Sequence, residues 1–222
     1  MHPIAHIHND LTTKFGVARQ SGLVPHLQSR IIFEPEYRNP DAFRGLEGFS
    51  HIWLIWDFSQ AHIQTWHPTV RPPRLGGNQR MGVFATRSPF RPNNIGLSSV
   101  RLTKIEFSTS DGPVLFVEGA DLMNLTPIYD IKPYLPYTDS HPEATSGFAQ
   151  DFLETTPLIV DFSDEIRALL SPIQLQALRE TLEANPRPQY HEDSSRTYHI
   201  IYANYDLSFQ IQDGRVSVFL PK

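Results

Sequence analysis

Residues 51–58 read HIWLIWDF, a short apolar run rich in β-branched and aromatic side chains. A run of this length and composition predicts a buried strand. Shorter strand-like segments lie on both sides of it, at residues 4–8, 28–33, 81–86, 97–107, 114–119 and 126–130. Because these segments are short and few helical patterns separate them, they predict a mainly β fold in which a single antiparallel sheet closes into a β-barrel.

The segment at residues 97–107 changes phase along its length. Val100 and Leu102 share one side of an extended chain, whereas Ile105 and Phe107 have the opposite parity. One extra residue in a strand produces such a shift. We therefore expect a β-bulge near Thr103.

Helical signals are concentrated towards the end of the chain. Ser163–Glu165 is expected to begin a helix with an acidic first turn, and Pro172 to end it and begin a second helix that reaches Ala184. Three further strands are expected at residues 197–203, 207–211 and 216–220. Asp213-Gly214 is a strong hairpin turn between the last two strands.

The chain between these two parts has no clear period. Pro133 and Pro136 are expected to keep residues 131–137 extended, and the polar residues 138–157 to form a linker. The sequence therefore predicts two domains, a β-barrel at residues 1–140 and a small α+β domain at residues 141–222.

The composition of the 222-residue chain is that of an ordinary globular protein, with 40% hydrophobic and 19% charged residues. The chain contains no cysteine, which excludes disulfides and thiolate metal sites. No apolar run approaches the ~20 residues that a membrane span needs, and the first residues lack a signal-peptide pattern. We therefore expect a cytoplasmic protein without a membrane partner.

The net charge of −5 hides a marked asymmetry. No acidic residue lies between Asp57 and Glu106. The basic residues of the same segment are Arg71, Arg74, Arg80, Arg87, Arg91, Arg101 and Lys104. A cationic segment in an otherwise acidic chain indicates an anion-binding surface. The alternative is that these side chains pair with acids from elsewhere in the fold.

Within this segment, residues 87–92 read RSPFRP. The two prolines stiffen the loop and reduce the entropy that it loses on ordering. A stiff loop can hold Arg87 and Arg91 ready for a carboxylate or phosphate, which a guanidinium binds through two parallel hydrogen bonds. The structural alternative is a turn whose arginines cap backbone carbonyls.

Other catalytic templates find no match. The chain has no G-x-S-x-G nucleophile motif and no phosphate loop of the G-x-x-x-x-G-K type. His2, His6 and His8 are typical of a polar terminal tail, so no metal site is expected. The motif DIKPY at residues 130–134 remains, with a plain salt bridge of Asp130 and a catalytic role as its two interpretations.

Several segments together resemble one known family. They are RGLEGFSHIWLIW at residues 44–56, VRPPRLGGNQRMGVFATRSPFRPNNIGLS at 70–98, DIKPYLPY at 130–137 and NPRPQY at 185–190. Through them the chain resembles the TsaA-like family, in particular its bacterial TrmO members. The resemblance implies a single-sheet barrel, S-adenosylmethionine as cofactor and a homodimer. The implied reaction is methylation of N6 of N6-threonylcarbamoyladenosine at position 37, in the anticodon loop of threonine tRNA.

The resemblance also implies which residues contact the cofactor. They are Ser21, Gly22, Leu23, Ser59, Gln60, Arg87, Leu97, Leu125, Thr126, Pro127 and Ile128. In this set, Arg87 is expected to bind the methionine carboxylate of the cofactor or to order the loop around it.

Methylation of N6 removes a proton from a weakly nucleophilic nitrogen, so a nearby base is expected. Asp130 is the candidate, with Lys132 and Tyr134 as positioning groups. The arginines expected to face tRNA phosphates are Arg71, Arg74, Arg80 and Arg91. Trp66 and Phe90 are candidates for stacking on a splayed base. Two alternatives stay open: a barrel that binds tRNA or an adenosine metabolite without transferring anything, and a methyltransferase for a small molecule.

Overall fold

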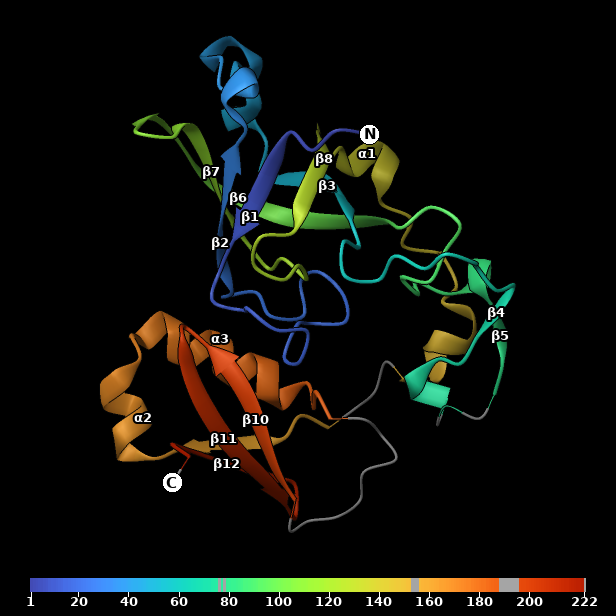
Figure 1. Ribbon diagram of the computed structural model, residues 1–222, viewed down its shortest axis with the longest axis vertical. Coiled ribbons are helices and arrows are strands. Elements are labelled where there is room, and N and C mark those ends of the chain that lie inside the picture. Colours follow the sequence, from blue (N-terminus) through green and yellow to red (C-terminus); the bar gives the residue numbers. More distant parts are fainter. Residues whose placement is uncertain (76, 78, 153–155, 188–195, 222) are drawn as a thin grey trace.

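A computed structural model describes residues 1–75, 77, 79–152, 156–187 and 196–221. Six antiparallel strands close into a barrel in the order β1-β2-β7-β6-β3-β8 (Figure 1). The strands are β1 (Ala5–His8), β2 (Gln28–Phe33), β3 (His51–Asp57), β6 (Ile95–Thr109), β7 (Gly112–Glu118) and β8 (Pro127–Pro133). The predicted single-sheet barrel is therefore confirmed.

Strand β3 shows how the sequence produces this barrel. Buried Ile52, Leu54 and Trp56 alternate along it with residues that are at least partly exposed. Successive side chains of a strand point to opposite faces, so every second residue of β3 enters the core. The other strands supply the rest of that core, which includes Ala5, Ile7, Ile31, Phe33, Val100, Leu115, Val117 and Ile128.

The β-bulge expected near Thr103 is confirmed. Leu102 pairs with Val117 and Lys104 pairs with Phe116, so Thr103 is the extra residue on β6. Its hydroxyl donates a 3.0 Å hydrogen bond to the carbonyl of Phe116. Because of the bulge, residues of opposite parity face the same side of β6 before and after Thr103. This accounts for the phase shift in the sequence.

The strand expected at residues 81–86 is wrong beyond Gly82. Strand β5 (Met81–Gly82) pairs with β4 (Thr69–Val70) and is followed by a 3₁₀ turn, η5 (Val83–Ala85). The amide and the hydroxyl of Thr86 both donate to the carbonyl of Val83, at 3.1 and 2.9 Å. These bonds satisfy the polar groups locally, so the chain turns instead of extending. Between β4 and β5, residues 76 and 78 lie outside the described residues.

The extended conformation expected through residue 137 is also wrong at its end. Strand β8 ends at Pro133, and Pro136 begins the short helix α1 (Pro136–Asp139). Proline is tolerated at the first helical position because its missing N–H would have no partner there. The carboxylate of Asp139 accepts from the amide of Leu135 at 2.9 Å, which closes this turn.

Most remaining helical structure in the barrel connections is of the 3₁₀ type. These turns are η1 (Pro35–Tyr37), η2 (Pro40–Phe43), η3 (Leu46–Gly48) and η4 (Pro73–Leu75), and η6 (Gly147–Phe152) follows α1. In the part of the chain that the structure describes, no helix has the length and apolar character needed to cross a bilayer.

A second, four-stranded sheet has the order β10-β11-β12-β9. Its elements are β9 (Ile159–Phe162), α2 (Asp164–Leu169), α3 (Pro172–Glu183), β10 (Thr197–Tyr202), β11 (Tyr205–Gln212) and β12 (Arg215–Phe219). The two helices begin at Asp164 and Pro172, where the sequence predicts them, and each is capped by a serine, Ser163 and Ser171. Strand β9 was not expected, because it is short and follows directly on the polar linker; it pairs in parallel with β12.

The second sheet and α3 lie below the barrel in Figure 1, with residues 9–27 between them. Leu11, Val24 and Leu27 from this segment are buried in the core of the second unit, together with residues of α3 and β10. The N-terminal segment therefore completes a core formed mainly by the C-terminal residues. The division of the chain at residue 140 stays a prediction.

One glycine of the barrel wall has no room for a side chain. A Cβ on Gly96 would lie 2.2 Å from Cε2 of Trp56, which is 6% exposed. We expect Gly96→Ala to lower the free energy of unfolding by about 1–3 kcal/mol, because the indole must move in a packed core. Urea unfolding measures this loss. Gly82→Ala is the matched control, since a Cβ there meets nothing within 4 Å; equal losses in both variants would contradict the prediction.

Candidate functional site

Three long connections meet at one end of the barrel. They follow β1, β3 and β7 and comprise residues 9–27, 58–94 and 119–126. In an antiparallel barrel these three strands run in the same direction, so the connections that leave them lie at the same end. We call them the rim. The residues expected to contact the cofactor lie on the rim or, for Leu97, Pro127 and Ile128, within the strand segments that leave it.

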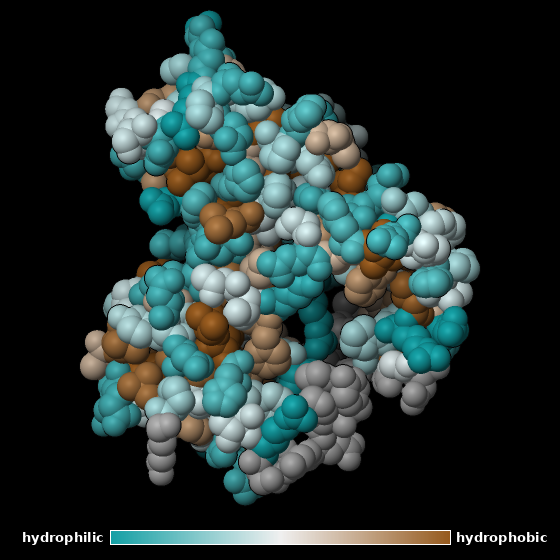
Figure 2. Space-filling model, in the orientation of Figure 1, coloured by the Kyte–Doolittle hydropathy of each residue, from teal (hydrophilic) through white to brown (hydrophobic). Residues whose placement is uncertain are grey.

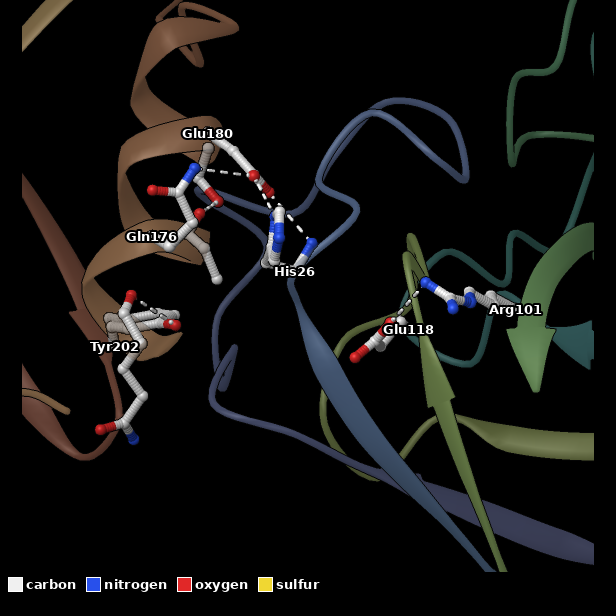
Figure 3. Close-up of polar contacts among 9 residues, drawn as sticks. His26, Arg101, Glu118, Gln176, Glu180 and Tyr202 are labelled. Atoms are coloured by element: carbon white, nitrogen blue, oxygen red, sulfur yellow. Dashed lines mark hydrogen bonds and ion pairs between the residues drawn. The ribbon is translucent and has the colours of Figure 1, made fainter. Parts of the chain in front are cut away.

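The first rim segment is held against the C-terminal unit. Leu11 forms a β-bridge with Tyr202, and the amide of Ala203 donates to the carbonyl of Asp10 at 3.1 Å. Figure 3 shows Glu180 of α3 facing His26, whose backbone amide donates to the carboxylate at 3.0 Å and whose ring forms an ion pair with it. The segment that carries Ser21–Leu23 is therefore fixed on both sides.

Two rim segments touch at glycines. The amide of Gly22 donates to the carbonyl of Gly119 at 2.8 Å. Both glycines have positive φ, 81° and 78°, a conformation that other residues rarely adopt. A Cβ on Gly119 would lie 3.5 Å from the backbone of Gly22. Backbone therefore approaches backbone here, next to Ser21 and Leu23.

Arg87 and Asp121 bring opposite charges to this contact. The guanidinium of Arg87 donates to the side-chain carbonyl of Gln20, so it lies beside Ser21. The carboxylate of Asp121 accepts a 2.5 Å hydrogen bond from the hydroxyl of Ser98 and lies near the backbone of Ser21. Burial raises the pKa of Asp121, and the Ser98 hydrogen bond and the charge of Arg87 oppose that rise. A half-buried carboxylate thus lies near an exposed guanidinium.

Sequence reasoning missed Asp121. Its hydrogen-bond chain continues into the barrel, because the indole N–H of Trp56 donates to the Ser98 hydroxyl at 2.9 Å. No local pattern around residue 121 indicates a charge at a barrel end. The only available signal was its position just after a buried strand, where a polar side chain opens a connection.

Strand pairing brings one predicted cofactor residue near the predicted base. Leu97 of β6 and Asp130 of β8 both pair with Ile55, on either side of β3. The three side chains are absent from the barrel core, and Leu97 is 57% exposed. We call the outward side of β6, β3 and β8 at this level the outer wall. Neighbouring strands are about 4.8 Å apart, so Leu97 and Asp130 lie on the outer wall about 10 Å apart.

The DIKPY motif follows β8 away from the rim. Lys132 forms a 3.0 Å ion pair with Asp130, and the amide of Ile131 donates to the other carboxylate oxygen at 2.9 Å. The ring of Tyr134 lies 5.4 Å from that of Trp53, farther along the wall. Asp130 and Lys132 are thus brought together, as the salt-bridge interpretation expects, while Tyr134 is placed with β3.

The other predicted cofactor residues differ in exposure. Ser59 and Gln60 are exposed, and Lys14 binds the carbonyl of Gln60 at 2.8 Å. Leu125 is 57% exposed and has a positive φ of 65°. Thr126 and Ile128 are buried, Ile128 within the barrel core. A contact between Ile128 and a ligand is therefore restricted to its backbone.

Residues 63–85, which include β4 and β5, extend to one side of the barrel (Figure 1) and form what we call the arm. Trp66 and Phe84 are 43% and 72% exposed, and their rings lie 6.1 Å apart. Phe84 was not predicted as a candidate for stacking on a base, because a place in the expected strand does not distinguish it from its neighbours. Phe90, just beyond the arm, is 47% exposed. Aromatic surface thus lies beside the cationic segment.

The predicted tRNA-binding arginines have different environments. Arg71 and Arg80 are exposed, and in the described ranges neither forms an ion pair; Arg80 donates to Thr69 at 3.1 Å. Arg91 caps the carbonyls of Val83 and Thr86 at 3.2 and 2.7 Å, which favours its structural interpretation. The side chain of Arg74 lies outside the described part, as do residues 188–190 of the NPRPQY segment.

Figure 2 shows one face of the molecule with hydrophilic and hydrophobic residues intermixed and a hollow between the barrel, the arm and the C-terminal unit. Among the described residues, no three histidine or acidic side chains are grouped closely enough to hold a metal ion. What the site offers is a set of hydrogen-bond donors, a cation and a half-buried anion at the rim, with aromatic and cationic side chains beside it. Such a set suits a small zwitterionic ligand together with a polyanion.

Comparisons with known proteins agree with this arrangement. Family models match both halves of the chain, the tRNA-methyltransferase O N-terminal domain at residues 6–140 and the TrmO C-terminal domain at residues 155–220. A curated relative from Escherichia coli K12, "tRNA (adenine(37)-N6)-methyltransferase", is 40% identical over 214 residues, covering 93% of this chain and 90% of its own.

Two proteins from Pseudomonas aeruginosa extend the comparison. One, called "putative S-adenosylmethionine-dependent methyltransferase RcsF", is 37% identical over 196 residues, which cover 85% of this chain and 81% of its own. The crystal structure of TrmO superposes with a TM-score of 0.75 at 28% identity, covering 99% of this chain and 98% of that one. The chain described here therefore belongs to the tRNA-methyltransferase O family.

Proposed function

We propose that the protein is an S-adenosylmethionine-dependent methyltransferase that modifies N6 of the adenosine at position 37 of tRNA. The observation that carries this proposal is the convergence of Ser21–Leu23, Ser59–Gln60 and Arg87 on one barrel rim, in a member of the tRNA-methyltransferase O family. The curated relative from Escherichia coli carries this activity in its name.

The chemistry of the rim fits the cofactor. The amino-acid end of S-adenosylmethionine has a carboxylate and an ammonium group, and the rim offers the guanidinium of Arg87 and the carboxylate of Asp121. The backbone of Gly22 and Gly119 leaves space that a side chain would fill. Bound there, the cofactor supplies a methyl group on a positively charged sulfur.

The residues of the chain then have distinct tasks. Arg87 binds the cofactor carboxylate, and Asp121 binds its ammonium group. The polar groups of Ser21, Ser59 and Gln60 and the backbone of residues 125–128 bind the rest of the molecule, while exposed Leu97 contributes apolar surface. Alignment of nitrogen, methyl group and sulfur is the main requirement of such a transfer, and a rigid rim provides it.

The arm presents a surface suited to an anticodon loop. Bases of a single-stranded loop can leave their stack and lie on an aromatic ring, for which Trp66, Phe84 and Phe90 are exposed. Arg71 and Arg80 supply positive charge to the phosphates. The absence of acidic residues between Asp57 and Glu106 in the sequence favours a polyanion here.

We expect the double variant Arg71→Ala/Arg80→Ala to bind every tRNA more weakly, whatever its sequence. Its binding constant is also expected to fall less steeply with salt concentration. Each lost phosphate contact reduces the slope of log K against log salt by about 0.7–0.9, so the double change reduces it by about 1.5. Filter binding between 50 and 300 mM salt, roughly the range where such slopes are measured, gives the slope. Arg44→Ala/Arg215→Ala removes the same charge from ion-paired positions and is the control. An unchanged slope in the arm variant would contradict the assignment.

The finer features of the reaction belong to the same proposal. The target adenosine carries the N6-threonylcarbamoyl group in threonine tRNA, the protein works as a homodimer in the cytoplasm, and exposed Leu97 on the outer wall lies towards the subunit interface. Sedimentation of the wild type and of Leu97→Glu tests the dimer, because a buried charge at an interface weakens association.

The function itself is tested with labelled S-adenosylmethionine and total bacterial tRNA, prepared with and without the threonylcarbamoyl modification. Label in modified tRNA only supports the proposal in full. Label in neither pool, despite cofactor binding, leaves the non-enzymatic binding barrel as the function. Label on a small molecule alone favours the remaining alternative.

A further inference from the structure

Three side chains form a cluster at the top of the outer wall, between the rim and Ile55. Nε2 of His62 lies 2.7 Å from a carboxylate oxygen of Asp57, the last residue of β3. The phenol of Tyr129 lies near the same carboxylate. The side chain of Asp57 is only 12% exposed, whereas that of His62 is 58% exposed. A buried carboxylate thus holds an accessible imidazole.

The strand register explains how these residues meet. Strand β8 shifts register against β3 between Ile55 and Trp56, where Ile55 pairs with Asp130 and Trp56 with Ile128, so Tyr129 is an extra residue that reaches Asp57. The chain after β3 turns back at once, because the amide of Ala61 donates to the carbonyl of Phe58 at 2.8 Å. His62 therefore returns to the strand it has just left.

The cluster lies among the residues assigned to the cofactor. Ser59 and Gln60 belong to the turn between Asp57 and His62, and Ile128 directly precedes Tyr129. Leu97 is one strand away, opposite Ile55. A group bound by these residues is within the surroundings of His62.

The hydrogen bond to Asp57 fixes the ring chemistry of His62. A carboxylate only accepts, so Nε2 carries a proton and the neutral ring has its lone pair on Nδ1. Burial and the nearby charge of Asp57 raise the pKa of the Tyr129 phenol, so it stays protonated beside that carboxylate. Asp57 therefore accepts from Nε2 and lies where its carboxylate can stabilise an imidazolium.

We propose that His62, oriented by Asp57, is the base that removes the N6 proton during methyl transfer; the inference rests on the proposed function. The bond between N6 and the methyl carbon forms as the methyl–sulfur bond breaks. The electron pair of the broken methyl–sulfur bond stays on sulfur. The proton on N6 passes to Nδ1 of His62 and then to water. His62 is a catalytic residue in this scheme, and Asp57 and Tyr129 are positioning residues.

Asp130, the base expected from the motif, is less free to accept a proton. Its two oxygens are occupied by Lys132 at 3.0 Å and by the amide of Ile131 at 2.9 Å. Nδ1 of His62 has no hydrogen-bond partner among the described residues. Asp130 is left to position the substrate on the outer wall.

A base of this kind makes turnover depend on pH. The titratable groups that face His62 within the described ranges are Asp57 from β3 and Tyr129 from β8, while Lys14 from the first rim segment binds the carbonyl of Gln60, two residues away. Single-turnover rates in the wild type are expected to rise with pH, because a general base accepts a proton only in its unprotonated form. In His62→Gln this dependence disappears.

We expect His62→Gln to lower kcat by about 100-fold, within the range typical of a lost general base, with KM for cofactor and tRNA nearly unchanged. Added imidazole is expected to restore part of the rate of His62→Ala. His199→Gln is the matched control, because His199 also lies beside an aspartate, Asp206 at 3.8 Å, but on the C-terminal sheet. Wild-type rate and pH profile in His62→Gln would overturn the proposal, as would a loss confined to Asp130→Asn.

A measurement on the protein without ligands separates this proposal from the function. The ¹⁵N shifts of the His62 ring are expected to show Nε2 protonated and Nδ1 bare in the neutral form, and a mixture of both tautomers in Asp57→Asn. A ring protonated on Nδ1 in the neutral wild type would overturn the proposal. Absence of methyl transfer in the wild type would instead refute the proposed function.

Discussion

Replacing Arg87 with alanine is expected to weaken S-adenosylmethionine binding by about 100-fold. A hydrogen bond to a charged group contributes about 1.5–3 kcal/mol, and each 1.4 kcal/mol is tenfold in affinity. The cofactor carboxylate is unchanged by methyl transfer, so Arg87 binds it equally before and during the reaction. We therefore expect kcat at saturating cofactor to stay near the wild-type value. Calorimetric titration gives the dissociation constant.

Three variants sharpen this result. Arg87→Lys keeps the charge but loses the planar fork, so part of the affinity is expected to return. Gln20→Ala removes only the partner that orients the guanidinium, and a loss below about tenfold is expected, as for a single neutral partner. Arg101→Ala removes an arginine of β6 that pairs with Glu118 and leaves the affinity unchanged. Tight binding by Arg87→Ala would show that the carboxylate is held elsewhere.

Asp121→Asn is expected to have opposite effects on stability and on binding. Burial raises the pKa of Asp121, so the folded state holds this proton more tightly than the unfolded state does. The ionised carboxylate therefore opposes folding above its unfolded pKa, and that cost disappears as pH falls through the folded pKa. We expect Asp121→Asn without ligand to be more stable than the wild type at pH 7, with the difference vanishing in acid.

The same variant is expected to lose about 10- to 30-fold in cofactor affinity, because the ammonium group loses its anionic partner. Urea unfolding as a function of pH and calorimetric titration measure the two effects. Asp161→Asn is the control, since its carboxylate pairs with Arg215 on an exposed surface and should change neither quantity by much. A variant that loses stability at pH 7 would contradict the assigned environment of Asp121.

The fold followed from the sequence wherever the signal was local and periodic. Alternation along residues 51–57 and the parity change at Thr103 are properties of single strands, and both correspond to what the structure has. The same reasoning predicted a strand at residues 83–86 and was wrong, because their conformation depends on Arg91. The guanidinium of Arg91 binds the carbonyls of Val83 and Thr86. A contact made by a side chain several residues away does not change the alternation of apolar residues from which a strand is predicted.

The candidate site divides in the same way. Arg87 and the DIKPY motif are conspicuous as short, unusual segments. Asp121 and Tyr129 are not, because each gains its place from strand pairing: Asp121 lies beside Ser98 of the neighbouring strand β6, and Tyr129 reaches Asp57 of β3 through a bulge. His62 depends on a turn only four residues long. These side-chain contacts form only in the folded chain, so no local sequence pattern indicates them.

The burial of Leu11, Val24 and Leu27 in the C-terminal core bears on the order in which the protein can fold. These residues leave the ribosome well before α3 and β10, against which they pack. The barrel strands can pair before α3 and β10 are made, but the segment that carries Ser21–Leu23 can pack against these elements only afterwards. Long-range closure of this kind is slow. A chain stopped after the barrel would thus have its sheet but leave the side chains of Leu11, Val24 and Leu27 in water, so the segment proposed to bind the methyl donor is held in place only once α3 and β10 have formed.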